Sequence, residues 1–136
     1  KKFFLKIFLT LLLLGFSVSQ AWAASKYFLL AGGNFSDTTK WASSSAAAAA
    51  NTNNSSTPTT GDDVFLDNAA NCAIDAATAA LNSLNMTGHT GNVTGAFDIT
   101  VTVASGTSTV LFAGTSPTWS GILKLNPAAG TTINLT

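Results

Sequence analysis

The sequence of 136 residues lacks arginine and glutamate altogether, and only 9% of its residues carry a charge. Every base is a lysine and every acid an aspartate, so the Glu–Lys pairs that support exposed helices cannot form. The polar residues are mainly threonine, serine and asparagine, which suit strands and turns better than helix interiors. A chain without arginine also lacks the basic surface that nucleic acids require. The composition therefore predicts a β-rich protein and excludes a nucleic-acid partner.

The chain has one histidine, His89, and one cysteine, Cys72. A two-histidine metal site therefore cannot form, and we expect His89, which lies between Gly88 and Gly91, to be a solvated turn residue.

For Cys72, a disulfide within the chain is excluded, which leaves an intermolecular bridge or a reactive thiol as the alternatives to burial. Because Cys72 lies two residues before Ile74 in a strand-like run, we expect it to behave as a small buried hydrophobe.

Aspartates are the remaining candidates for chemistry. Glycoside hydrolysis commonly needs two carboxylates that face each other, but the neighbours Asp62 and Asp63 point to opposite sides of a strand. Asp63 and Asp67 can share a face with Asp75, and calcium binding through these carboxylates is the alternative to simple solvation. We predict no catalytic, cofactor-binding or metal-binding residue in this chain, and no cofactor.

The first 23 residues have the pattern of a signal peptide. Three lysines among the first six residues precede the apolar run Ile7–Val18, and Ala21 and Ala23 supply the small residues of a cleavage site. The alternative is an uncleaved membrane anchor, which needs roughly 20 apolar residues. We expect cleavage after Ala23 and a mature protein that is secreted or held at the cell surface, with no membrane span.

Residues 24–60 are expected to form an N-terminal segment that precedes the main body. A short strand at Tyr27–Leu30 and one helical turn ending near Trp41 are expected here. Phe35 and Trp41 are expected to be buried, with stacking on sugar rings as the alternative. The low-complexity stretch Ser43–Thr60 is expected to be a mobile surface loop, because isolated short helices are marginal in water.

Residues 61–136 alternate apolar and polar side chains in short runs, which is the period-2 pattern of strands with one buried face. The clearest run is Ile99–Val103, and Gly61–Asp67 is the first firm one. Glycine and asparagine between the runs supply turns. Near-constant spacing favours stacked coils of roughly 20–25 residues, which predicts an all-β, right-handed parallel β-solenoid, with a β-sandwich as the alternative. Further alternating pairs are Cys72 with Ile74, Leu84 with Met86, Val110 with Phe112, Leu123 with Leu125, and Ile133 with Leu135.

Two stretches of this body leave alternatives open. Residues Asp75–Leu81 contain several alanines, and we expect a turn there, with a single helical turn as the alternative. Trp119 is expected in a loop, either as a platform for carbohydrate or packed over the side of the body.

At the far end of the body, Ile133 and Leu135 are expected to leave an apolar strand edge that invites self-association. The chain is expected to be a fragment of a longer protein.

The motif Gly33-Asn34-Phe35-Ser36-Asp37, then Trp41, a low-complexity insertion and Pro58–Val64, resembles the N-terminal part of secreted bacterial repeat proteins with parallel β-helix bodies. These are adhesin-like or autotransporter-passenger-like surface proteins, in which tryptophan is common at the position of Phe35. The resemblance implies an extracellular structural or adhesive protein with surface glycans as possible partners. The alternative is the N-terminal part of a carbohydrate-active or carbohydrate-binding β-helix protein.

Overall fold

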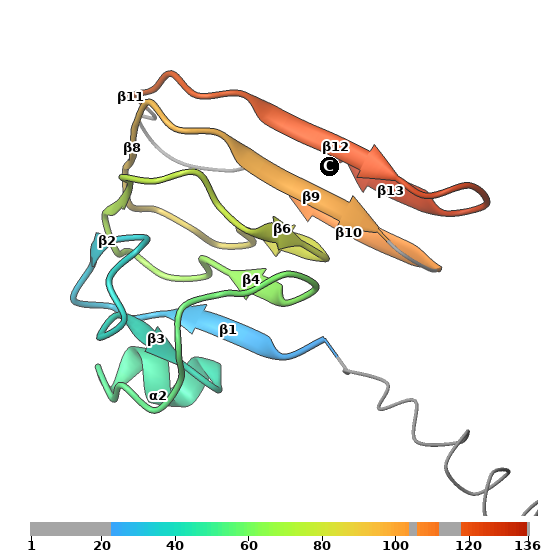
Figure 1. The fold of residues 1–136 in the computed structure, drawn as a ribbon. Coiled ribbons are helices and arrows are strands. Elements are labelled where there is room, and N and C mark those ends of the chain that lie inside the picture. The colour runs from blue at the N-terminus through green and yellow to red at the C-terminus, as the bar shows by residue number, and fades with distance from the viewer. Residues whose placement is uncertain (1–22, 104–105, 112–117, 136) are drawn as a thin grey trace, which may run out of the picture.

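The computed structural model describes residues 23–103, 106–111 and 118–135, and most of its ordered elements are strands (Figure 1). The prediction of a β-rich protein is therefore confirmed. The expected signal peptide lies outside the described residues, apart from Ala23. In chain order the elements are β1 Ser25–Phe28, β2 Gly33–Asn34, β3 Trp41–Ala42, α2 Ser45–Ala49, β4 Asp63–Phe65, β5 Cys72–Ile74, β6 Ala80–Leu81, β7 Ser83–Asn85, β8 Val93–Gly95, β9 Ile99–Val103, β10 Thr107–Leu111, β11 Thr118–Trp119, β12 Leu123–Pro127 and β13 Thr132–Leu135.

The strands form three sheets, and from β4 onward the chain visits them in a fixed rotation. The first sheet has the order β13-β10-β7-β4-β1-β3, the second β11-β8-β5-β2 and the third β12-β9-β6. Each strand from β4 to β10 thus pairs with the strand three places later, and all these pairs are parallel. Among the described residues only β1 and β3 pair in antiparallel orientation. We call one passage through the three sheets a circuit.

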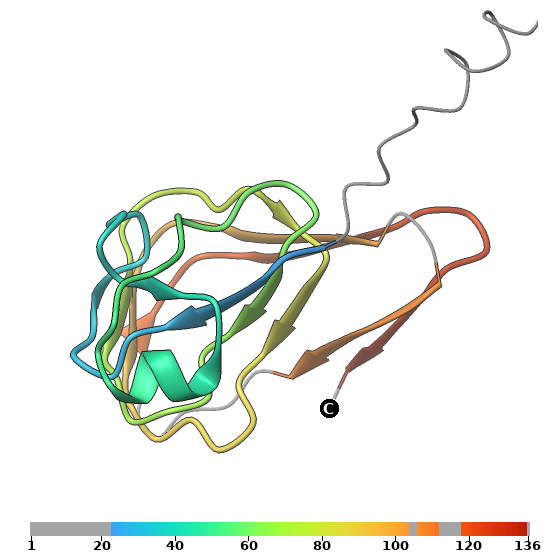
Figure 2. The same ribbon diagram turned by 90° about the horizontal axis from the view of Figure 1, so that it is seen from below.

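The strand registers place apolar residues beside apolar residues of the next strand, and together these residues form one apolar interior. In the first sheet Val64 pairs with Leu84, and Leu84 pairs with Val110. In the third sheet Ile99 and Val101 pair with Leu123 and Leu125. Seen along the stack, the circuits superpose around a shared interior (Figure 2). Successive residues along a strand point to opposite faces. The apolar residues of each strand therefore enter this core, and the polar residues between them face outward.

The strand patterns expected from alternation place the buried residues correctly. Ile99, Val101 and Val103 are almost completely buried, while Thr100 and Thr102 between them are half-buried. Leu84 and Met86 are likewise buried. The stretch Asp75–Leu81 contains no helix and ends in β6, which confirms the expected turn over the helical alternative.

The low-complexity stretch Ser43–Thr60 is not simply the surface loop that was expected, because it contains the helix α2. The Ser44 hydroxyl caps this helix by accepting a hydrogen bond from the Ala47 amide at 3.2 Å. Ala48 is buried in a small cluster with Leu29 and Ala42. A five-residue helix is unstable alone, so this packing, which composition does not reveal, stabilises it.

The expected helical turn before Trp41 is also wrong. The Asp37 carboxylate accepts hydrogen bonds from the amide and hydroxyl of Thr39, each at 2.8 Å, which fixes a tight turn instead. These bonds hold the pKa of Asp37 below its usual value. Trp41 then begins β3, which pairs with β1. The expected strand at Tyr27–Leu30 is β1, displaced two residues towards the N-terminus.

The two ends of the stack differ (Figure 1). Strand β3 and helix α2 lie over the end formed by β1. Strands β11, β12 and β13 are the last in their sheets at the other end. Ile122 and Leu135 are 62% and 65% exposed there. No helix in the described part of the chain has the length and apolar character needed to cross a membrane.

Candidate functional site

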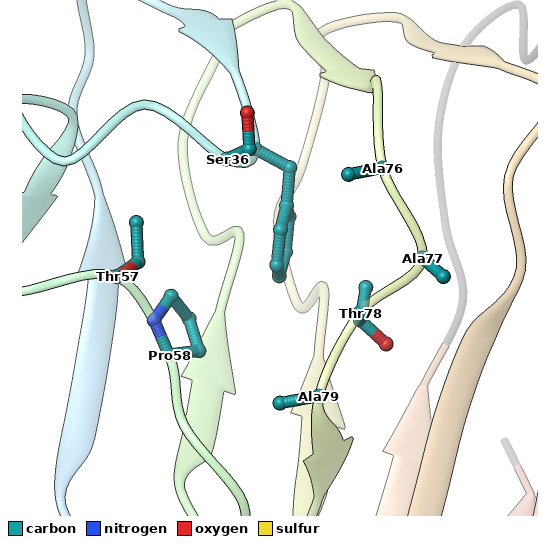
Figure 3. A pocket seen from close by; sticks show the side chains of 8 residues that line it. Ser36, Thr57, Pro58, Ala76, Ala77, Thr78 and Ala79 are labelled. Atoms are coloured by element: carbon teal, nitrogen blue, oxygen red, sulfur yellow. The ribbon is translucent and has the colours of Figure 1, made fainter.

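A pocket of about 170 Å³ lies at the corner between the second and third sheets, where the N-terminal segment meets the circuit of β4–β6. Thr57 and Pro58 lie on one side and Ala76–Ala79 on the other (Figure 3). Phe35 and Ser36 complete the lining. Most of this surface is apolar, and the polar lining residues are Ser36, Thr57 and Thr78. No lining residue is ionisable, so the pocket suits a small uncharged molecule and offers no acid–base group of its own.

The sequence offered no signal for this pocket, because its lining comes from three separated stretches of small residues. One nearby carboxylate is already engaged. Asp75 accepts hydrogen bonds from the amide of Ser36 at 3.0 Å and from its hydroxyl at 2.6 Å. Slight burial acts to raise the pKa of Asp75, but the bonds from Ser36 outweigh it and the pKa is lowered. The carboxylate therefore holds the Phe35–Ser36 turn in place.

The neighbours Asp62 and Asp63 occupy different surroundings, as strand geometry requires. Asp62 is 6% exposed and accepts hydrogen bonds from the Ala24 amide and from the amide and hydroxyl of Thr59. The Lys26 ammonium lies 3.9 Å from its carboxylate. Asp63 instead accepts bonds from Asn82 and Ser83 in the next circuit. The pair ties adjacent chain segments together and does not form a facing pair of carboxylates.

The three aspartates considered for calcium do not come together. Asp63 binds Asn82 and Ser83, Asp67 accepts a hydrogen bond from the Ser45 hydroxyl at 3.1 Å, and Asp75 binds Ser36. Within the described ranges, no three His, Cys, Asp or Glu side chains are grouped so as to hold a metal ion. Each carboxylate therefore satisfies a hydroxyl, amide or backbone donor of a neighbouring segment.

The expectation that His89 is solvated is wrong. Its side chain lies in a turn, but only 5% of the residue is exposed. Neither ring nitrogen makes a hydrogen bond of good geometry within the described structure, although the backbone of Asn68 lies near the ring. Burial lowers the pKa of His89, while the nearby backbone of Asn68 and the charge of Asp67 act in the opposite direction. The flanking glycines correctly indicated a turn, but they could not show that this turn packs against another.

Cys72 is buried, as expected from its spacing to Ile74. It is 1% exposed and lies in the main core cluster. Burial raises the pKa of the Cys72 thiol far above its ordinary value, and the charge of Asp75 adds to this effect. The thiolate is the reactive form of cysteine. The environment therefore argues against a reactive thiol in the folded protein.

We expect Cys72 in the native protein to react with a disulfide reagent more than about a hundred-fold slower than in denaturant, because both burial and the raised pKa oppose attack. The reaction is followed by absorbance at mildly alkaline pH. A Ser120→Cys variant in a Cys72→Ala background provides the accessible control, since Ser120 is exposed. Equal rates for Cys72 in native and denatured protein would contradict the burial of this residue.

The aromatic side chains considered as sugar platforms are used in packing. Phe35 and Trp41 are 6% and 0% exposed, and their rings meet edge to face with centroids 4.9 Å apart. Trp119 is half-buried against the core, and its indole nitrogen donates to the Phe97 carbonyl at 2.8 Å. It lies in β11 and not in a loop. Phe35 and Trp41 therefore offer no free stacking face of the kind a sugar ring needs, whereas Trp119 is only partly covered.

Comparison of the chain with models of protein families, with curated proteins and with solved structures gave no match.

Proposed function

We propose that this chain forms one end of a right-handed parallel β-solenoid, and that the protein is an exported, surface-associated structural or adhesive protein. The observation that carries the proposal is the repeated pairing of each strand from β4 to β10 with the strand three places later, always in parallel. In such an architecture stability comes from the stacking of circuits, and function comes from the long outer surface that the circuits create.

The strand pairing supports the solenoid over the β-sandwich. A sandwich of this kind is built from two antiparallel sheets, whereas the pairs here are parallel apart from β1 with β3. The antiparallel pair lies at the end of the stack, where it and α2 cover the first circuit. Terminal segments that cover an exposed end are a general requirement of stacked repeat architectures.

The outer surface supports a structural or adhesive role. Outward positions on the strands carry small polar side chains, such as Thr94, Thr100 and Thr102. Such side chains hydrogen-bond to neighbours and present a neutral face. The pocket at the corner has no ionisable lining residue. Phe35 and Trp41 do not favour the alternative of a carbohydrate-active protein, because their rings are buried in packing.

Cysteine pairs test the architecture. Thr102 and Asn126 are paired residues on β9 and β12, so cysteines at both positions in a Cys72→Ala background are expected to cross-link rapidly with a short thiol cross-linker. The matched control places cysteines at Thr94 and Thr102, which are closer in sequence but lie on strands of different sheets. Faster cross-linking of the control pair, measured by peptide mass spectrometry, would overturn the solenoid.

Export and binding are tested with residues 1–136 fused to a reporter in a bacterial host. We expect the reporter outside the cytoplasm, a mature chain that begins at Ala24 by mass spectrometry, and loss of export when Leu11–Leu14 are replaced by serine. A glycan array then separates the two classes of function. Reproducible binding to one glycan that is lost in Trp119→Ala would favour the carbohydrate alternative and count against a purely structural role.

A further inference from the structure

The turn that holds His89 packs directly on the turn one circuit earlier. We call residues 86–91, which follow β7, the His89 turn. Within it the His89 amide donates to the Met86 carbonyl at 3.0 Å, and the Thr90 amide reaches the Asn68 carbonyl at 3.3 Å. At Gly91 the backbones are so close that a Cβ atom would lie 2.0 Å from the Ala70 carbonyl oxygen. The two turns are thus in direct backbone contact at Gly91, and the imidazole beside this contact is only 5% exposed.

This enclosure favours the neutral form of the imidazole. A protonated imidazole has two N–H donors. Neither ring nitrogen of His89 makes a hydrogen bond of good geometry in the described structure, and burial outweighs the nearby Asn68 backbone and the Asp67 charge, which favour the protonated form. Burying an ionised group without partners is far more costly than burying a neutral one. If the turn swings away from Asn68 and Ala70, water solvates the ring and both donors are satisfied. Protonation therefore favours an open turn.

We propose that the His89 turn is an acid-sensitive latch between two circuits, which stays closed while the imidazole is neutral and opens when it takes up a proton. The charged group that faces the ring is Asp67, in the turn beneath it. The His89 turn contains no other titratable residue. The sequence that follows β10, residues 112–117, contains none either. The proposal is independent of the adhesive function.

The direction of the pH effect follows from proton linkage. Because the pKa of His89 is lowered in the closed turn, the open turn binds a proton at higher pH than the closed one. Opening therefore becomes easier as the pH falls through about 6.5, the ordinary histidine value. Between pH 7.5 and 5.5 the open fraction is expected to rise by up to about ten-fold, the limit for a closed turn that takes up no proton in this range. An ordinary aspartate, which titrates near 3.9, does not change its charge between pH 7.5 and 5.5. Cys72 does not either, because its pKa is raised far above its ordinary value.

Amide hydrogen exchange by NMR measures the opening directly. We expect the protection factors of the His89 and Thr90 amides, corrected for intrinsic exchange, to fall by up to about ten-fold between pH 7.5 and 5.5. The Val101 amide, in the middle of β9, serves as an internal reference and is expected to keep its protection. In His89→Gln the fall is expected to vanish, since glutamine is polar but does not titrate. His89→Asn is the second variant if His89→Gln does not fold.

Three results would overturn the latch. One is constant protection of the His89 turn in the unaltered protein across this range. Another is the same fall in His89→Gln or His89→Asn. The third is an imidazole that titrates near pH 6.5 while the turn stays protected. The Asp67→Asn variant provides the matched control: the fall is expected to persist there, and its loss would assign the effect to Asp67 and reject His89.

Discussion

Replacing Gly95 with alanine is expected to lower the free energy of unfolding by about 4 kcal/mol. Gly95 ends β8 with a φ of +105°, a conformation that residues with a side chain rarely adopt. A Cβ atom there would lie 2.2 Å from the carbonyl oxygen of Ile74, its partner on β5. Because the obstructing atom belongs to the backbone, neither strand can yield without loss of the β5–β8 pairing.

Chemical denaturation with urea measures this loss, and two other glycines separate its causes. Gly61 has a φ of +88° but nothing within 4 Å of its Cβ position, so Gly61→Ala is expected to cost only about 1 kcal/mol. Gly91 lacks a positive φ but would clash with the Ala70 carbonyl, so Gly91→Ala reports the steric part. If Gly95→Ala cost no more than Gly61→Ala, the close parallel approach of β5 and β8 would be refuted.

Sequence reasoning identified the strands whose apolar and polar residues alternate over several positions. In β9 three buried residues alternate with threonines, and in β4 Val64 is flanked by polar or half-buried residues. This pattern depends only on the two-residue period of a strand and on one buried face. It needs no knowledge of the neighbours, which is why β4, β7 and β9 could be recognised from the sequence.

The elements that were missed owe their structure to neighbours in space. Strand β2 has only two residues, Gly33 and Asn34, and is ordered by pairing with β5. Strand β8 ends at Gly95, and glycine in this position is more typical of a turn than of a strand. Helix α2 depends on the burial of Ala48 against Leu29, which the run of five alanines does not indicate. Each of these elements is stabilised by contacts that are distant in sequence.

The candidate sites show the same division. The burial of Cys72 was predictable from its position on a strand, and the separation of Asp62 from Asp63 was predictable because neighbouring residues of an extended chain point to opposite sides. The burial of His89 was not, because it depends on how its turn stacks on Asn68 in the preceding circuit. The corner pocket was missed for a similar reason, since stacking alone brings Phe35 near Ala76–Ala79.

Replacing Trp41 with alanine is expected to cost about 4 kcal/mol, because a completely buried large side chain leaves a cavity that its neighbours cannot fill. The ring packs edge to face on Phe28 and Phe35, with centroids 5.1 Å and 4.9 Å apart. Its indole nitrogen also donates to the Phe35 carbonyl at 3.1 Å. In a domain with 5–15 kcal/mol of total stability, this loss is expected to move the urea midpoint markedly.

Two further variants separate the causes of the stability lost in Trp41→Ala. Trp41→Phe keeps a ring but leaves the Phe35 carbonyl without its donor, so about 1–3 kcal/mol is expected. Trp119 is half-buried at the opposite end of the stack, and Trp119→Ala is expected to cost less than Trp41→Ala. A small effect of Trp41→Ala, no larger than that of Trp119→Ala, would mean that β3 and α2 do not stabilise the first circuit. The large effect expected would instead make the N-terminal segment part of one cooperative unit with the stacked sheets.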